Sequence, residues 1–421
     1  MPFVTGLRCV FCGTLQAARA HTCASCGLTG ILDVEYDYAA IARRLTRPAL
    51  ARRARDQWRY RELLPIRPRA TLPPLSVGWT PICEAPALAR HLGVRVLFLK
   101  DEGRNTTGSL KDRASAVGAV KAREAKAAVI ACASTGNAAS SLAGMAAAMG
   151  LRVVIFLPQR APEPKVTQLL IFGATVLRVR GSYDQAWELC QRTCTEFGWY
   201  NRNGAVNPYL VEGKKTVSLE ISEQMDWQPP DWVAVSIGDG CTIAGAWKGF
   251  REMKALGLIE QTPRMLGVQA AGAAPVAAAF ASGRPLEPIA PQTIADSIAV
   301  GVPRNWKKAV SAVAASGGAM VTVSDDEILD AMRYTGRLAG VFAEPAAATA
   351  VAGLRRAVEQ GVVPAAASAL AVITGSGLKD IRAAQSAVGA PFEVEPDGGG
   401  LKEVLAQQDL LTTPPKRKSA S

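Results

Sequence analysis

The sequence predicts an α/β protein built on two doubly wound α/β domains and preceded by a cysteine-rich segment. The chain has 421 residues, 49% hydrophobic and 20% charged, which suits a globular protein of up to three domains. From about residue 94 onward, short apolar runs alternate with helical stretches, as parallel strands covered by helices do. Four cysteines near the N-terminus form closely spaced pairs outside this alternation.

The N-terminal segment, residues 1–38, is predicted to be a zinc-ribbon-like unit. Cys9 and Cys12 form one Cys-x-x-Cys pair and Cys23 and Cys26 a second, so four thiolates can surround one structural Zn²⁺. The alternative, two redox-active pairs, lacks the βαβ context of such motifs. The remaining cysteines are expected to lie mostly in the core of a protein from a reducing compartment: Cys83, Cys132, Cys190, Cys194 and Cys241.

An arginine-rich connecting arm is predicted over residues 39–75. Between Arg43 and Arg69 there are ten arginines against two acidic residues, within a chain of formal net charge +12. One interpretation is a surface for an anionic partner such as nucleic acid. We favour the other, a solvated arm or helix that wraps the catalytic body, because Leu45, Leu50 and Trp58 are interleaved with the arginines. No nucleic-acid partner is therefore expected.

The main α/β region is expected over residues 76–395, with a smaller subdomain inserted at about 115–210. Apolar runs there predict short buried strands over Val94–Leu99, Ala127–Ala133, Arg152–Pro158, Thr175–Val179, Trp232–Ile237, Met265–Gln269, Met320–Val323 and Ala369–Ile373. The stretches between several of them predict helices over Ala138–Met149, Pro164–Phe172, Tyr183–Phe197, Val217–Met225, Asp325–Leu338 and Ala346–Gln360. Ligands of such sheets bind at the carboxyl ends of the strands, where the loops carry the chemistry.

The ends of the chain and its longest apolar run predict a cytoplasmic protein with no membrane partner. The first residues lack the basic and apolar regions of a signal peptide. The run Leu142–Leu157 is interrupted by Arg152 and is interpreted as a buried helix followed by a strand. A C-terminal tail is expected over residues 396–421, and its basic cluster at 416–418, which follows Pro414-Pro415, is interpreted as a disordered, solubilising end.

Lys111 is the candidate catalytic residue. The strand Val94–Leu99 runs into a polar turn of Gly, Ser and Thr, and Lys111 then opens a helix rich in small residues. Helix-terminal N–H groups and the neighbouring Arg113 are expected to disfavour its ammonium form, and a neutral amine forms a Schiff base with an aldehyde. The alternative is an ordinary surface lysine at the start of a helix.

The loop Ser134-Thr135-Gly136-Asn137 is a candidate substrate site. It follows the strand Ala127–Ala133, and free N–H groups at the start of the next helix make a cradle for a carboxylate together with two hydroxyls. The Asn137 amide can also donate to a phenolate oxygen. The alternative is an ordinary Ser/Thr N-cap.

Two further loops complete the candidate site. Gly238-Asp239-Gly240-Cys241-Thr242 precedes a helix and suits a phosphate, with the Asp239 carboxylate pointing away from it. In Thr374-Gly375-Ser376-Gly377, Thr374 places a neutral hydroxyl where it can bond a ring nitrogen; the alternative is a turn with two glycines. An amine, a carboxylate cradle, a phosphate cradle and a neutral hydroxyl are what pyridoxal 5'-phosphate and an amino acid require.

At these residues the chain resembles the threonine synthase family, within the tryptophan-synthase-β-like group of pyridoxal-phosphate (PLP) enzymes of fold type II. Threonine synthases usually carry Pro in place of Thr106 and Phe in place of Leu110, and many begin with a cysteine-rich ribbon followed by a Tyr-Asp pair, as at Tyr36-Asp37. The resemblance covers roughly Leu7 to Phe392. The motifs that carry it lie at residues 100–103, 107–113, 134–139 and 374–380, with Glu344-Pro345-Ala346 as a family turn in which we favour a structural role for Glu344.

The resemblance implies a lyase of amino-acid biosynthesis that converts O-phospho-L-homoserine and water to L-threonine and phosphate through a Lys111 Schiff base. Lys111 then takes protons from Cα and Cβ, phosphate leaves from Cγ, and water adds at Cβ. The other roles implied are cofactor binding by Asn137, Gly238, Asp239, Gly240, Cys241, Thr242 and Thr374, and binding of the substrate carboxylate by Ser134, Thr135 and Gly136. A homodimer is also implied.

One position departs from the family pattern. Many threonine synthases place a basic residue just after an Asn-Pro-x triplet to help bind the substrate phosphate, and here Leu210 follows Asn207-Pro208-Tyr209. Lys214 or Lys215 is expected either to substitute for it or to be solvated. The alternative function is a PLP-dependent β-replacement or elimination on another amino acid, as in cysteate synthase, cysteine synthase or threonine dehydratase. A zinc-ribbon nucleic-acid binder is the non-enzymatic alternative.

Overall fold

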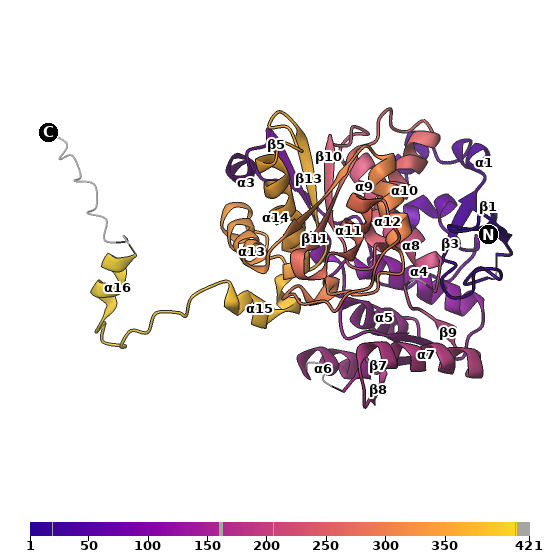
Figure 1. Ribbon diagram of the computed structural model, residues 1–421, viewed down its shortest axis with the longest axis horizontal. Helices are drawn as coiled ribbons and strands as arrows, with labels where there is room; N and C mark the ends of the chain where they lie inside the picture. Colours follow the sequence, from indigo (N-terminus) through magenta and orange to yellow (C-terminus); the bar gives the residue numbers. More distant parts are fainter. Residues whose placement is uncertain (19, 160–162, 205, 409, 411–421) are drawn as a thin grey trace.

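The computed structural model describes residues 1–18, 20–159, 163–204, 206–408 and 410. The basic cluster at 416–418 lies outside them. The N-terminal segment forms a three-stranded antiparallel sheet of order β2-β1-β3, with β1 (Val4–Cys9), β2 (Leu15–Gln16) and β3 (Leu32–Tyr36). It packs onto the body (Figure 1), because Leu7, Val34 and Tyr36 belong to the same apolar cluster as Trp247 and Phe250. The cysteine-rich segment therefore shares a core with the rest of the protein.

The arginine-rich arm packs on the body, as predicted, through three short helices: α1 (Tyr38–Ala42), α2 (Arg47–Ala51) and the 3₁₀ helix η1 (Gln57–Leu63). Leu45, Leu50 and Trp58 are buried. Arg59 is also buried: Nη2 donates to Glu223 Oε1 at 2.6 Å, and the guanidinium lies 4.4 Å from the Trp79 ring centroid. The prediction of a solvated arm is wrong for Arg59, because an ion pair and an aromatic ring replace its hydration.

The larger sheet has six strands in the order β12-β11-β10-β13-β5-β4, and only the edge strand β4 runs antiparallel to its neighbour. Its strands are β4 (Ile82–Glu84), β5 (Val96–Asp101), β10 (Trp232–Ser236), β11 (Arg264–Ala270), β12 (Ala319–Val323) and β13 (Ser368–Ile373). Successive residues of β10 enter different cores: Val233 and Val235 pack with Trp247, whereas Trp232 and Ala234 pack with Leu354. Both faces of this sheet are thus covered, as expected for continuous apolar strands.

Helices cover both faces of the larger sheet. They are α3 (Pro86–Leu92), α10 (Cys241–Ala255), α11 (Pro275–Ser282), α12 (Trp306–Ala315), α13 (Asp325–Ala339) and α14 (Pro345–Glu359), with the short 3₁₀ turns η2 (Glu102–Arg104), η3 (Ala271–Ala273), η4 (Asp296–Ile298) and η5 (Gly377–Lys379). Beyond the last strand, α15 (Ile381–Ser386) packs against α13, and the chain then leads away from the body to α16 (Leu401–Gln407) (Figure 1). Among the described residues no helix is long and apolar enough to cross a membrane.

The smaller sheet has four parallel strands in the order β8-β7-β6-β9. It contains β6 (Ile130–Ala133), β7 (Val153–Pro158), β8 (Thr175–Val179) and β9 (Tyr200–Asn201), flanked by α5 (Asn137–Ala148), α6 (Glu163–Ile171) and α7 (Tyr183–Phe197). The predicted helix and strand within Leu142–Leu157 are confirmed as α5 and β7. The prediction that Thr175–Val179 is buried is wrong, because β8 is the edge strand and its residues are exposed or half-buried.

Three helices connect the two sheets along the chain. Helix α4 (Lys111–Glu124) leads from the larger sheet to the smaller one, and α8 (Tyr209–Lys214) and α9 (Thr216–Gln224) lead back. Helices α4 and α8 approach closely at Gly213, where an added Cβ would lie 2.2 Å from the carbonyl oxygen of Arg113. Helix α8 is not among the helices predicted from the sequence. This packing brings the C-terminal end of α8 toward the start of α4.

Candidate active site

The four predicted loops meet at one cavity of about 690 Å³, a size typical of small-molecule sites. It opens at the carboxyl ends of β6, β10 and β13, where parallel α/β sheets bind ligands. All candidate catalytic, cofactor and substrate residues from the sequence line it: Lys111, Ser134, Thr135, Gly136, Asn137, Gly238, Asp239, Gly240, Cys241, Thr242 and Thr374. Residues up to 263 positions apart in the chain, from Lys111 to Thr374, therefore share one site.

Lys111 is the first residue of α4, as predicted, and lines the cavity. Burial and the nearby positive charge of Lys214 together lower the pKa of its amine to about 8, against the opposing effect of Glu344. The interpretation as an ordinary surface lysine is therefore wrong. Near neutral pH this amine exchanges a proton more readily than a solvated lysine.

Arg113 is not the neighbour that perturbs Lys111. Its guanidinium points into a fully buried network, where Nε and Nη2 bond Glu102 at 2.6 and 2.7 Å and Nη1 and Nη2 bond Glu220 at 2.6 and 2.7 Å. Lys100 Nζ also donates to Glu220, at 2.9 Å. The predicted cause of the lysine's lowered pKa is thus corrected, since two carboxylates neutralise Arg113. The network instead ties the first turn of α4 to β5 and α9.

The helices α5 and α10 begin at the cavity without a side-chain cap. Their N-cap residues are Gly136 and Gly240, and no side chain of the residues that the structure describes accepts from the first N–H groups of either helix. By contrast, α7 and α13 each begin with a capping box, at Ser182 and Ser324. The Ser/Thr N-cap interpretation of the 134–137 loop is therefore wrong. Uncapped N-terminal N–H groups at a cavity are suited to bind anions.

The 238–242 loop requires its glycines. A Cβ on Gly238 would lie 2.9 Å from Ile298 Cα, and one on Gly240, whose φ is +95°, would lie 2.8 Å from the Asn305 carbonyl oxygen. The Asp239 carboxylate is held by the adjacent segment, since it accepts from the backbone N of Arg304 and from Asn305 Nδ2, both at 2.7 Å. This leaves a bare backbone cradle at the N-terminus of α10, which fits a phosphate group.

Glu344 belongs to the site and was not predicted there. Asn137 Nδ2 donates to Glu344 Oε1 at 3.0 Å and to Oε2 at 2.9 Å, across 207 residues of sequence. Glu344 is buried at the start of α14, and burial raises the pKa of its carboxyl. The Glu344-Pro345 pair alone indicates only a helix start, so sequence gave no signal for this contact. The Asn137 amide is thus already oriented by a carboxylate.

The basic residues near the Asn207-Pro208-Tyr209 triplet differ in surroundings. Leu210 is fully buried and does not line the cavity. Its side chain packs against Gly118 of α4, where an added Cβ would lie 3.0 Å from Leu210 Cδ2. Lys214 does line the cavity. Lys215 is fully buried and pairs with Glu212 and Glu252, at 2.5 and 2.8 Å. Neither lysine is solvated, and only Lys214 faces the site.

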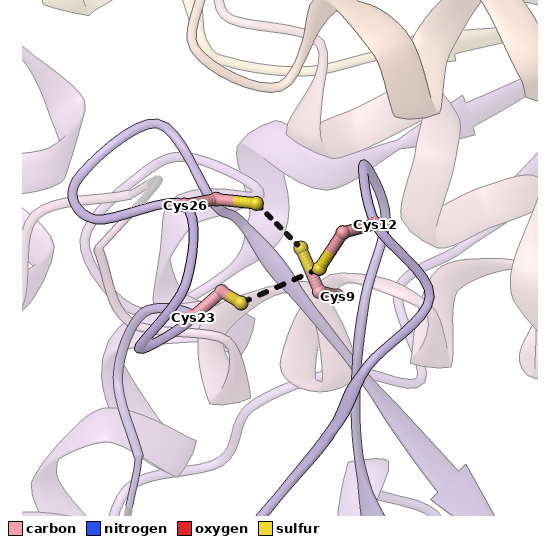
Figure 2. A group of neighbouring side chains, drawn as sticks. All are labelled: Cys9, Cys12, Cys23 and Cys26. Carbon is pink, nitrogen blue, oxygen red and sulfur yellow. Dashed lines mark hydrogen bonds between the residues drawn. The ribbon is translucent and has the colours of Figure 1, made fainter.

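The four N-terminal cysteines form a second candidate site (Figure 2). All four sulfurs lie within 4.8 Å of one another, with Cys9–Cys26 at 3.9 Å and Cys12–Cys23 at 3.6 Å. Sulfurs at tetrahedral positions about 2.3 Å from one zinc ion lie roughly 3.8 Å apart. The arrangement is compatible with one Zn²⁺ held by both pairs, rather than with two separate redox pairs.

Comparison with known proteins agrees with this architecture. Residues 74–375 match the family described as pyridoxal-phosphate dependent enzyme. The chain is 37% identical to the threonine synthase of Methanocaldococcus jannaschii over 405 residues, covering 95% of this chain and 99% of that protein. It is 38% identical to that of Methanosarcina acetivorans over 404 residues (95% and 98%) and 40% identical to that of Synechocystis over 323 residues (76% and 82%).

Solved structures share the fold. The processed form of threonine deaminase isoform 2 from Solanum lycopersicum superposes with a TM-score of 0.63 at 21% identity, over 74% of this chain and 88% of that one. Maize serine racemase superposes with a TM-score of 0.63 at 22% identity, over 78% and 92%. At these identities the likeness concerns the fold alone.

Proposed function

The chain belongs to the threonine synthase family of pyridoxal-phosphate-dependent enzymes, and from this premise we propose that it converts O-phospho-L-homoserine and water to L-threonine and phosphate. The observation that carries the proposal is the Lys111 amine, with a pKa lowered to about 8, in one cavity with the uncapped N-termini of α5 and α10. One nucleophilic amine and two anion sites match a cofactor and substrate that carry an aldehyde, a phosphate and a carboxylate.

The residues present fit pyridoxal 5'-phosphate. Gly238, Gly240 and the N–H groups of α10 would hold its phosphate. A side chain on either glycine would collide with the neighbouring segment, at Ile298 or Asn305, and would displace the loop. Thr374 would face its ring nitrogen with a neutral hydroxyl, and Asn137 its phenolate oxygen. When bound, the cofactor supplies an aldehyde for the Lys111 amine and an electron sink for negative charge developing on substrate carbon.

The chain's own groups then bind and move protons. Ser134, Thr135 and Gly136 hold the substrate carboxylate against the N-terminus of α5, which orients Cα and Cβ toward Lys111. The Lys111 amine accepts and returns protons at these carbons, and its pKa near the working pH favours transfer in both directions. Glu344 fixes the Asn137 amide in place.

We propose further that Cys9, Cys12, Cys23 and Cys26 hold one structural Zn²⁺, supported by the spacing of their sulfurs. Family resemblance also supports a homodimer in the cytoplasm. Metal analysis of the purified protein tests for zinc, and sedimentation tests for the homodimer. Imaging of a tagged chain tests the cytoplasmic location.

The test of the activity is direct. Cofactor-loaded protein is incubated with O-phospho-L-homoserine, and threonine and phosphate are measured by mass spectrometry and a phosphate assay. We expect equal amounts of both, and neither from the Lys111→Ala variant. Turnover of O-acetylserine, serine or threonine without turnover of O-phospho-L-homoserine would instead support a β-replacement or elimination enzyme.

A further inference from the structure

We propose that Arg202 and Lys214 form a subsite for a phosphate monoester dianion, separate from the glycine cradle at 238–242. The inference rests on the proposed function and deepens it. It names the two residues that take the phosphate of the substrate in a chain where Leu210 stands at the usual basic position.

Arg202 is a buried cation that lacks a carboxylate partner among the described residues. It follows β9 and is held by its backbone N, which donates to the Ala131 carbonyl oxygen at 2.8 Å. The side chain is 4% exposed and lines the cavity. Nη2 donates to the neutral Ser115 hydroxyl at 2.9 Å, and Nε finds no hydrogen-bond partner in the described parts of the chain. Burying a charged guanidinium without a carboxylate partner costs free energy, unless an anion enters the cavity and pairs with it.

Lys214 supplies the second charge. It is the last residue of α8, is 5% exposed and lines the same cavity. In the part of the chain that the structure describes, its amine forms no ion pair, whereas the next residue, Lys215, is bonded to two carboxylates. The contrast between adjacent lysines indicates that the carboxylates available near α8 neutralise Lys215 and leave Lys214 for a ligand.

Of the four carboxylates that the structure describes on the cavity wall, Asp184 is exposed to solvent and the other three are engaged elsewhere. Glu344 accepts both hydrogen bonds from Asn137, Asp239 accepts from the Arg304–Asn305 segment, and Asp296 pairs with Lys165. Within the described part of the chain, Arg202 and Lys214 therefore remain as positive charges on the wall without an ion-pair partner. Both also lower the pKa of Lys111, which indicates that the two charges lie near its amine.

This arrangement suits a phosphate ester. Arginine offers a planar fork of donors and lysine a compact charge, and the pair matches the two negative charges of a phosphate monoester. Substrate and cofactor both carry such a group. The glycine cradle already fits one phosphate, so we assign Arg202 and Lys214 to the leaving phosphate of the substrate.

The test measures binding of inorganic phosphate by calorimetry to the cofactor-loaded protein, whose cradle is filled. The variants are Lys214→Met, which keeps the side-chain volume, and Arg202→Lys, which keeps the charge. Arg180→Ala, an exposed arginine outside the cavity, is the control. Loss of one charged contact is expected to weaken phosphate binding roughly ten- to a hundred-fold in Lys214→Met, and less in Arg202→Lys. The KM for O-phospho-L-homoserine should rise in parallel.

Cofactor affinity, measured by fluorescence titration of the cofactor-free variants, shows whether Arg202 and Lys214 bind the phosphate of the substrate or that of the cofactor. Unchanged cofactor affinity with weakened phosphate binding supports the substrate assignment. Weakened cofactor affinity with unchanged phosphate binding assigns the pair to the cofactor instead and overturns that assignment. If neither quantity changes in Lys214→Met, the subsite does not exist. Phosphate binding that depends on Lys214 without threonine formation would leave the subsite standing and refute the proposed function.

Discussion

The lowered pKa of Lys111 predicts how the cofactor-free protein captures pyridoxal phosphate as pH changes. At pH 7 an amine of pKa about 8 is roughly 9% neutral, against about 0.03% at the ordinary value of 10.5, a difference of about 300-fold. Because only the neutral amine attacks an aldehyde, the capture rate should rise with pH and level off near pH 8.

The assay follows the absorbance change on capture between pH 6 and 10 by stopped flow. Nα-acetyl-lysine, reacted with the same aldehyde, is the reference and cancels the cofactor's own ionisation. In Lys214→Met the levelling-off should move to higher pH, since one of the positive charges that lower the pKa of Lys111 is removed. A protein profile that keeps rising in parallel with the reference up to pH 10 would refute the reasoning.

Three further predictions concern the structure around the site. Removing zinc by chelation, or the substitution Cys9→Ser, should lower the melting temperature measured by calorimetry, because the cysteine-rich sheet shares the main core. An unchanged melting temperature would count against a structural metal. Arg113→Met should cost roughly 3–5 kcal/mol of unfolding free energy in urea denaturation, because it leaves two buried carboxylates unpaired, and a loss below about 1 kcal/mol would contradict the buried network. Gly240→Ala should weaken cofactor binding at least about tenfold in a fluorescence titration, whereas Gly257→Ala, at a similar positive φ but with open surroundings, should leave it unchanged.

The local sequence pattern was sufficient to predict the strands and the loops that follow them. All eight predicted strands exist, because a strand buried on both faces needs a continuous apolar run. Parallel pairing in the larger sheet then places the loops after β10 and β13 at one edge, which is why Gly238 and Thr374 lie together. Ser134 follows β6 of the smaller sheet, and it reaches the same cavity because the two sheets pack together there. The prediction of burial failed for β8 and in part for β12, both edge strands, since strand order decides which strand is at the edge and sequence does not reveal that order.

What sequence did not reveal depends on contacts between distant segments. Arg113 stands two residues from Lys111, but helical geometry turns it toward Glu102 and Glu220. Lys214 and Lys215 are alike in sequence, and only the packing of α8 gives them different partners. The contact of Asn137 with Glu344 joins the first turns of two helices that lie in different parts of the chain. In each case the side chain's role is set by tertiary packing.

Turnover of O-phospho-L-homoserine by the cofactor-loaded protein in H₂¹⁸O tests the central proposal most directly. We predict threonine with ¹⁸O in its hydroxyl group, and an equal amount of phosphate free of ¹⁸O, because the carbon–oxygen bond at Cγ breaks and water adds at Cβ. Phosphate that carries ¹⁸O together with homoserine, or phosphate release without threonine, would contradict it.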